Sequence, residues 1–259
     1  MRRQDLLGAL AAVEGSSVGL AAHDRALLDS WGADVRGALE ILPFASPLEQ
    51  ARELANVLGD QAGFQGDDAD YYNSNNCLIH EVLERRRGMP ILLSIVWMEV
   101  GKRASLTLSG VGMPGHFLVR VGGNKGVLAD PFSGGSIVTI EDCRRTVREL
   151  SGGAFAWTND FLSPSTTDQI LERVLQNMAG SYSREEDEAG RFRAATFLSA
   201  LRPDSPERLL ERAEIAGSLG LRDMAAESYS ELLERFPETV EAQQAADKLA
   251  EDDAPNLDN

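Results

Sequence analysis

The spacing of apolar residues changes along this chain, and the change constrains the fold more than any other feature. Up to about residue 103, apolar residues such as Leu6, Leu10 and Val13 recur every three or four positions, the period of an amphipathic helix. From Leu106 to about Pro131 they alternate with other residues, as in a strand that is buried on one face. Beyond residue 165 the helical period returns. The sequence therefore predicts an α+β fold, with a helix-plus-antiparallel-sheet domain followed by an all-α region.

Composition and turn residues divide the chain further. We predict a helical part packed on the core, a core domain, a helical repeat region and a disordered acidic tail, at residues 1–62, 63–162, 163–250 and 251–259. Within the core, Asn76 is predicted to cap a helix over 77–87 that Gly88 ends. Pro90 is predicted to begin a second helix that runs to about Arg103. Strands are predicted at 106–111, 117–121 and 127–131, with a further strand at 137–140.

The charge and cysteine content exclude several function classes. The net charge is −16 and the pI is near 4.6, which disfavours binding to nucleic acid or to an anionic membrane surface. Two cysteines and three histidines stand far apart, so we expect no disulfide framework, metal site or cofactor. No stretch approaches the roughly 20 apolar residues that cross a bilayer. These features predict a soluble protein of the cytoplasm.

The C-terminal helices contain an internal repeat. Pro203 and Pro237 are 34 residues apart, and 34 residues is the tetratricopeptide period. Counted back from Pro237, Gly220, Ala225 and Tyr229 occupy the turn, small and large positions of that motif. The earlier copy keeps Tyr182 but has Arg191 at the small position, and helix 240–249 is a candidate cap. The pattern predicts a protein or peptide partner for these helices; the alternative is an unrelated helical hairpin with the same spacing.

One histidine and one aspartate flank a predicted hairpin. Closing a hairpin through a short loop at 122–124 opposes His116 to Asp130 and Leu118 to Leu128. Opposed side chains share a face and lie about 4.5–5.5 Å apart at Cβ, so the imidazole would reach the carboxylate. Such a pair fixes the tautomer of a catalytic histidine, or it forms a purely structural hydrogen bond at the end of the hairpin.

Several motifs together carry a family resemblance. They are Gly63-Phe64, Asp70-Tyr71-Tyr72, Arg85-Arg86-Arg87-Gly88-Met89-Pro90-Ile91, Leu93-Ser94, Pro114-Gly115-His116-Phe117-Leu118-Val119-Arg120 and Asp130-Pro131-Phe132. Over residues 60–250 the chain resembles the transglutaminase-like superfamily, and within it the bacterial SirB-type invasion-regulator proteins that carry C-terminal tetratricopeptide repeats. The resemblance implies a transglutaminase/papain-like domain, in which a Cys at a helix start precedes the His and Asp strands.

The chain departs from that family's enzyme pattern at the nucleophile. Pro90 stands where the cysteine belongs. Ser94 lies one helical turn later and is the first substitute, with a hydrogen bond to the Pro90 carbonyl as the structural alternative. Cys77 is the second substitute, with core packing as its alternative. We assign Cys143 no role.

Other residues near the predicted helix start are candidate ligand contacts. They are Asp70, Tyr72, Asn75, Arg87 and Pro90. The acidic and amide side chains could instead organise the loop through Asx turns, and the run of arginines from residue 85 could complement a helix dipole. Two functions remain: a non-catalytic regulatory or binding protein, or a serine- or cysteine-dependent amidase, peptidase or acyl transferase. A carbohydrate or peptide binder that uses the former catalytic cleft is a lesser possibility.

Overall fold

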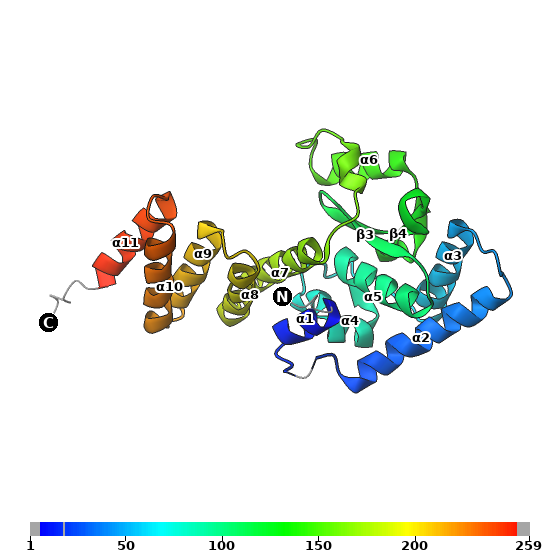
Figure 1. Cartoon of the computed structure of the whole chain (residues 1–259), viewed down its shortest axis with the longest axis horizontal. Helices are drawn as coiled ribbons and strands as arrows, with labels where there is room; N and C mark the ends of the chain where they lie inside the picture. The colour runs from blue at the N-terminus through cyan, green and yellow to red at the C-terminus, as the bar shows by residue number, and fades with distance from the viewer. Residues whose placement is uncertain (1–5, 18, 253–259) are drawn as a thin grey trace. The chain divides into compact units, whose positions relative to one another are not determined.

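The computed structural model describes residues 6–17 and 19–252, in two compact units. The first unit is Met1–Val174 and the second is Leu175–Asn259, so the boundary falls inside the helix α7 (Thr167–Arg184), which is labelled in Figure 1. Residues 253–259 of the predicted acidic tail lie outside the described residues.

The N-terminal part of the first unit is helical, as the apolar spacing predicts. Its elements are α1 (Leu6–Val13), α2 (Ala22–Glu40), α3 (Pro47–Leu54) and a π-helical segment, η1 (Ala55–Gln61). A capping box between Ser46 and Glu49 begins α3, with Pro47 in its first turn. α2 packs against α5 (Pro90–Arg103), which ties this part to the core.

The next segment corrects one predicted helix and confirms another. A short 3-10 turn, η2 (Ser74–Cys77), precedes α4 (Ile79–Arg85), whose N-cap is Leu78 rather than Asn76. α4 ends at Arg86 in the left-handed conformation (φ 61°), so the predicted stop at Gly88 is wrong. Gly88 instead belongs to β2 (Arg87–Gly88), which pairs in parallel with β1 (Gln65–Gly66). α5 begins at Pro90 and ends at Arg103, as predicted.

The core sheet is antiparallel and has the order β3-β4-β5-β6. Its strands are β3 (Leu108–Met113), β4 (His116–Val121), β5 (Val127–Asp130) and β6 (Ser136–Val138). The predicted hairpin register is wrong, because Leu128 faces Arg120 and not Leu118. The cause is a longer loop: Gly123–Lys125 forms a 3-10 turn, η3, and Val121 pairs with Val127. The predicted strand at 137–140 is shorter, since Thr139 caps the next helix, α6 (Ile140–Leu150).

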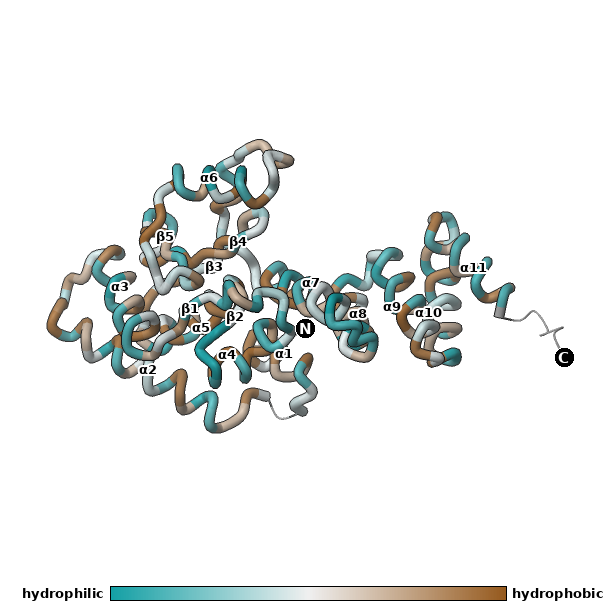
Figure 2. Tube along the Cα trace, turned by 180° about the vertical axis from the view of Figure 1, so that it is seen from behind, coloured by the Kyte–Doolittle hydropathy of each residue, from teal (hydrophilic) through white to brown (hydrophobic). Residues whose placement is uncertain are grey.

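Helices cover both faces of the core sheet. On one face, Leu118 and Leu128 pack with Cys143 and Val147 of α6. Alternate residues of β4, such as Val119, point to the other face, and α5 packs there against β3 and β4. Hydrophobic residues run along parts of β3 and β5 in Figure 2. A 3-10 turn, η5 (Asn159–Leu162), leads to the last helix of the unit.

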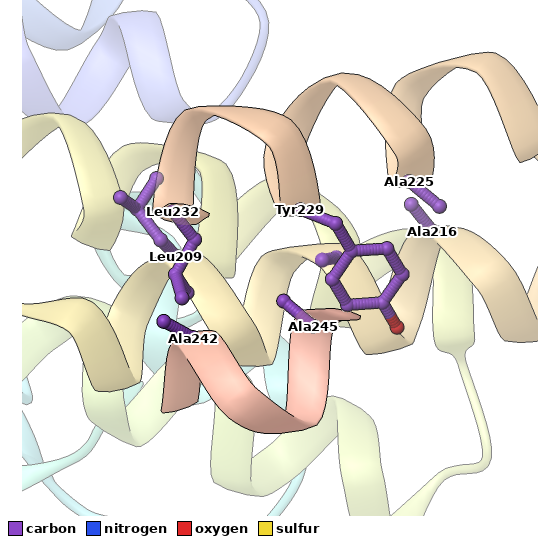
Figure 3. Packing of buried hydrophobic residues seen from close by; sticks show 8 residues of the cluster. Leu209, Ala216, Ala225, Tyr229, Leu232, Ala242 and Ala245 are labelled. Carbon is purple, nitrogen blue, oxygen red and sulfur yellow. The ribbon is translucent and has the colours of Figure 1, made fainter. Parts of the chain in front are cut away.

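The second unit is entirely helical where it is described. Its helices are the C-terminal part of α7 (Thr167–Arg184), then α8 (Glu188–Leu201), α9 (Pro206–Ser218), α10 (Arg222–Arg235) and α11 (Val240–Asp252). α9, α10 and α11 enclose a core in which Tyr229 packs beside Ala225 and Ala245 (Figure 3). In the part of the chain that the structure describes, no helix is both long and apolar enough to cross a bilayer.

Candidate functional site

His116 and Asp130 lie at neighbouring strand ends and are in contact. His116 begins β4 and Asp130 ends β5. Nε2 of His116 lies 3.0 Å from Oδ2 of Asp130, and the two side chains are 13% and 11% exposed. The predicted contact is therefore present, although the residue that the register places opposite Asp130 is Leu118. Contact survives the wrong register because positions 116 and 118 share a face of the strand.

Asp130 is held as a carboxylate by three donors. Besides His116, its oxygens accept from the backbone N–H of Phe132 at 3.0 Å and from the Ser133 hydroxyl at 2.9 Å. Burial raises the pKa of Asp130, but these hydrogen bonds and the charge of His116 outweigh it, so the pKa lies below its ordinary value. The ionised Asp130 accepts a hydrogen bond from Nε2–H of His116, which leaves Nδ1 as the ring nitrogen available to a ligand.

Aromatic rings extend the site from His116 towards loop 67–77. Phe132 lies in the 3-10 turn η4 (Pro131–Ser133), directly after Asp130. Its ring meets those of His116 and Tyr71 edge to face, with centroids 6.1 and 5.9 Å away. Tyr71 also meets Tyr72 at 5.1 Å, and Tyr72 is 51% exposed. The row of rings therefore runs from the half-buried imidazole to the protein surface.

A buried asparagine anchors this loop at the start of α5. The Asn76 side chain donates to the Asp70 carbonyl at 2.8 Å and accepts from Arg85 at 3.2 Å. The backbone carbonyl of Asn76 accepts a hydrogen bond from the N–H of Met89, the residue before Pro90, at 3.0 Å. Arg85 also pairs with Asp67 at 3.1 Å. These hydrogen bonds connect the Asn-rich loop and Arg85 to the backbone just before α5, so these residues hold the start of that helix in place.

The predicted ligand contacts have local partners. Oδ2 of Asp70 accepts from the Asn73 side chain at 2.8 Å, and the N–H of Asn75 donates to Oδ1 of Asn73 at 2.9 Å. Arg87 donates to the Gly63 carbonyl at 3.3 Å, and Pro90 is buried as the first residue of α5. The hydrogen bonds of Asp70 and Asn75 are those of the loop-organising alternative. A role for these residues and for Tyr72 in binding stays a prediction.

The candidate nucleophiles are enclosed. Ser94 is fully buried, and its hydroxyl lies 3.5 Å from the carbonyl of Phe117, the residue after His116. Among the described residues this acceptor replaces the Pro90 carbonyl that the sequence suggested. Cys77 is 1% exposed, with its sulfur 3.3 Å from that of Met89. In the described parts of the chain, no group of three or more His, Cys, Asp or Glu side chains is placed to hold a metal ion.

One half-buried arginine of the site is not marked by any motif in the sequence. Arg173 reaches from α7 and donates to the Met113 carbonyl at 2.8 Å, and Met113 pairs with His116 across the hairpin. Its guanidinium lies 5.4 Å from the Phe117 ring centroid. The positive charge of Arg173 lowers the pKa of Tyr71, but burial has the larger effect and leaves that pKa raised. The only available signal was the position of an arginine on a helix, which is too common to single it out.

Comparisons with known proteins cover this whole site. A family profile described as the transglutaminase-like superfamily matches residues 23–176. A UPF0162 protein from Xylella fastidiosa (strain 9a5c) is 34% identical over 197 residues, covering 74% of this chain and 70% of that protein. A UPF0162 protein from Pseudomonas aeruginosa is 31% identical over 159 residues, covering 61% and 58%. Human F-box only protein 21 is 28% identical over 178 residues, covering 64% of this chain but 27% of that protein.

Proposed function

We propose that this chain, which belongs to the transglutaminase-like superfamily and to the UPF0162 family, binds a protein or peptide partner. We propose further that it has no transglutaminase or cysteine-protease activity. The observation that carries this proposal is Pro90 at the first position of α5. A cysteine nucleophile needs the thiolate-favouring start of a helix and a nearby imidazole. Proline supplies no nucleophile and no N–H at that position.

The surroundings of the other nucleophiles support the same proposal. Burial raises the pKa of the Cys143 thiol, which disfavours the reactive thiolate. A nucleophile must contact the substrate and also lie within hydrogen-bonding distance of its general base. Cys77 and Ser94 are enclosed in the core, so a substrate cannot contact them in this structure. We also assign the protein to the cytoplasm, since neither Cys77 nor Cys143 is joined in a disulfide.

We assign partner binding to tetratricopeptide-type repeats in the second unit; the SirB-type proteins, which the chain resembles, also carry C-terminal repeats of this type. Three observations support this assignment. Gly220 makes the left-handed turn between α9 and α10, and Ala225 and Tyr229 are buried between the helices. In the degenerate copy, Gly190 supplies the small residue one position before Arg191, because a Cβ at Gly190 would lie 2.6 Å from the Tyr182 ring.

A pocket in this unit offers one contact surface for a partner. Glu214, Ser218, Arg222, Tyr229 and Lys248 from α9, α10 and α11 contribute to its lining, and its volume is about 510 Å³. Lys248 pairs with Glu251 at 2.9 Å, so Arg222 is the better cation for an acidic or carboxyl-terminal peptide group.

The second candidate is a serine- or cysteine-dependent amidase, peptidase or acyl transferase. It is favoured by one observation, the His116–Asp130 pair with an ionised carboxylate. That pair is the part of a triad that activates a nucleophile. In this alternative, a local opening of the core exposes the Ser94 hydroxyl or the Cys77 thiol, which attacks the carbonyl carbon of an amide or ester. The imidazole of His116 takes the nucleophile's proton and passes it to the amine or alcohol that leaves as the acyl-enzyme forms.

Activity probes separate the two candidates. The full chain is treated with a fluorophosphonate, which reports activated serine, and with iodoacetamide, which reports reactive thiol. We expect no specific labelling in the wild type. Labelling that is lost in Ser94→Ala or Cys77→Ala, and also in His116→Ala, would favour the amidase or acyl transferase instead. Cys143→Ala is the matched control, because it removes the other buried thiol.

Partner binding is tested with peptides selected from a displayed library on the full chain. The affinity of a selected peptide should fall by about ten-fold or more in Arg222→Glu, because an attraction between opposite charges across the interface becomes a repulsion. Arg144→Glu, in the first unit, is the control and should bind normally. Selected peptides that bind Arg222→Glu as well as the wild type would contradict the assigned surface.

A further inference from the structure

Arg173 is a half-buried cation that has no carboxylate partner in the described part of the chain. Among the described residues, no Asp or Glu oxygen lies within salt-bridge distance of its guanidinium, and its contacts are the Met113 carbonyl and the Phe117 ring. Two other half-buried arginines have carboxylate partners: Arg85 pairs with Asp67 at 3.1 Å and Arg103 with Glu99 at 2.7 Å. Arg86 has no carboxylate partner among the described residues, but its guanidinium lies over two rings, those of Trp31 and Phe64. A charge removed from water is normally compensated by an opposite charge, and Arg173, with one carbonyl and one ring, is less compensated than these three arginines.

Most of the N–H groups of Arg173 find no acceptor among the residues that the structure describes. A guanidinium carries five N–H groups in a planar fork, and the described residues offer an acceptor to one nitrogen, Nη1. Burial lowers the pKa of Arg173, yet an arginine keeps its proton under all physiological conditions. An anion that takes two parallel hydrogen bonds from the fork would supply the missing charge.

Tyr71 and His116 each add a polar group to this part of the first unit. Neither the hydroxyl of Tyr71 nor Nδ1 of His116 meets a hydrogen-bond partner among residues 6–17 and 19–252. Both rings contact the same third ring, Phe132, and the charge of Arg173 acts on the Tyr71 hydroxyl. All four residues belong to the first unit. They combine an aromatic wall with a cation, a hydroxyl and an imidazole, the mixture typical of a small-ligand site.

We propose that Arg173, Tyr71 and His116 form a binding site for a ligand with a single carboxylate, whose planar group takes paired hydrogen bonds from the guanidinium. One unpaired cation balances one negative charge, whereas a phosphate ester carries up to about two at neutral pH. The net charge of −16 also repels polyanions. The aromatic rings of Tyr71 and Phe132 suit a flat or apolar body next to the carboxylate. This site does not depend on partner binding by the second unit.

Benzoate and benzamide provide a matched pair of probes, because they share a shape and differ in charge. Each is titrated into the isotopically labelled full chain, and two-dimensional NMR follows the side-chain N–H of Arg173 and the backbone N–H of His116. We expect saturable shifts with benzoate and binding at least about ten-fold weaker with benzamide, the difference that one charge-assisted bidentate pair makes. Equal binding of the two probes, or no saturable shift with benzoate, would overturn the proposal without the use of any variant.

Three variants then locate the carboxylate. Arg173→Gln should weaken benzoate by about ten-fold or more, and Arg173→Lys should weaken it less, because the charge remains while the planar fork is lost. Tyr71→Phe should weaken it several-fold. Arg144→Gln is the control and should bind as the wild type does. If Arg173→Gln binds benzoate as tightly as the wild type, the carboxylate does not lie on Arg173. The serine and thiol probes do not report on this result, so either proposal can fail alone.

Discussion

At the residue scale, the ionised Asp130 is the residue that orients the imidazole of the site. Three donors converge on its carboxylate, and one of them fixes the imidazole of His116 with Nδ1 turned away from the carboxylate. This arrangement serves a catalytic base and a ligand-binding histidine equally well, because both need a defined tautomer. The two functions differ in whether a nucleophile lies beside the imidazole. The helix α5, which packs against β4, begins with Pro90 and supplies no nucleophile at that position.

Replacing Asp130 by Asn should destabilise the protein in a pH-dependent way. Because its folded-state pKa is depressed, the carboxylate stabilises the fold above its unfolded pKa of about 3.9. That contribution is lost as the pH falls through the lower folded value. At pH 7 we expect Asp130→Asn to lower the free energy of unfolding by about 1–3 kcal/mol, and the difference should shrink on acidification. Urea denaturation from neutral to acidic pH measures it.

Ser133→Ala is the control for this experiment, since it removes one of the three donors to Asp130. Its cost should be about 0.5–1.5 kcal/mol. If Asp130→Asn cost the same at every pH, the depressed pKa would not be the source of the stabilisation.

The sequence predicted the His116–Asp130 contact but not the role of Arg173. Histidine and aspartate lie near the ends of consecutive strands, where a hairpin brings them together under more than one register. Arg173 reaches Met113 from a helix that is distant in the chain. Only the folded structure shows that no carboxylate of the described residues pairs with its charge, so no local pattern could have identified Arg173.

At the element scale, the accuracy of each predicted boundary depends on whether its cause is local. α5 begins at Pro90 because proline suits the first turn of a helix, and that signal is local. α4 ends at Arg86 and not at Gly88, since the left-handed Arg86 places its guanidinium 4.6 Å from the Trp31 ring centroid. Trp31 belongs to α2. The contact that offsets the unfavourable left-handed conformation of Arg86 therefore comes from a residue distant in the chain, which a local sequence pattern does not show.

The turn after Asp130 offers a test of backbone constraint near the site. Gly134 and Gly135 both have positive φ, 66° and 91°. A Cβ at Gly135 would overlap the Trp97 ring and lie 2.8 Å from Cβ of Ala55, while a Cβ at Gly134 meets nothing within 4 Å. We expect Gly135→Ala to cost about 3 kcal/mol or more, because overpacking adds to the backbone penalty.

Gly134→Ala is the matched control and should cost about 1–2 kcal/mol, the backbone penalty alone. Thermal and urea denaturation of both variants give the comparison. Equal costs for the two substitutions would show that the contact of Gly135 with Trp97 does not constrain the turn.

At the scale of the whole molecule, each of the two units contains a hydrophobic cluster. Cys143 and Val147 of α6 pack with strand residues in the first unit, while α9, α10 and α11 enclose a core of their own in the second. The sequence predicted a change from strand to helix periodicity between these regions, because periodicity reports burial within each element. The predicted start of the repeat region at residue 163 stays a prediction; the compact units divide between Val174 and Leu175, within α7.

The separate cores predict that a cavity in the second unit acts locally. Leu232 of α10 is fully buried among residues of α9 and α11, so Leu232→Ala should destabilise that unit by about 2–5 kcal/mol. Hydrogen exchange should quicken in α9–α11 and change little in β3–β6, because each region opens with the free energy of its own contacts. Met224→Ala on the same helix removes a 44% exposed side chain and should leave both regions near the wild type. Equal acceleration of exchange in the sheet and in α9–α11 would show instead that the two units unfold together. In that case, a loss of stability in the proposed partner-binding helices would also destabilise the site of His116 and Asp130.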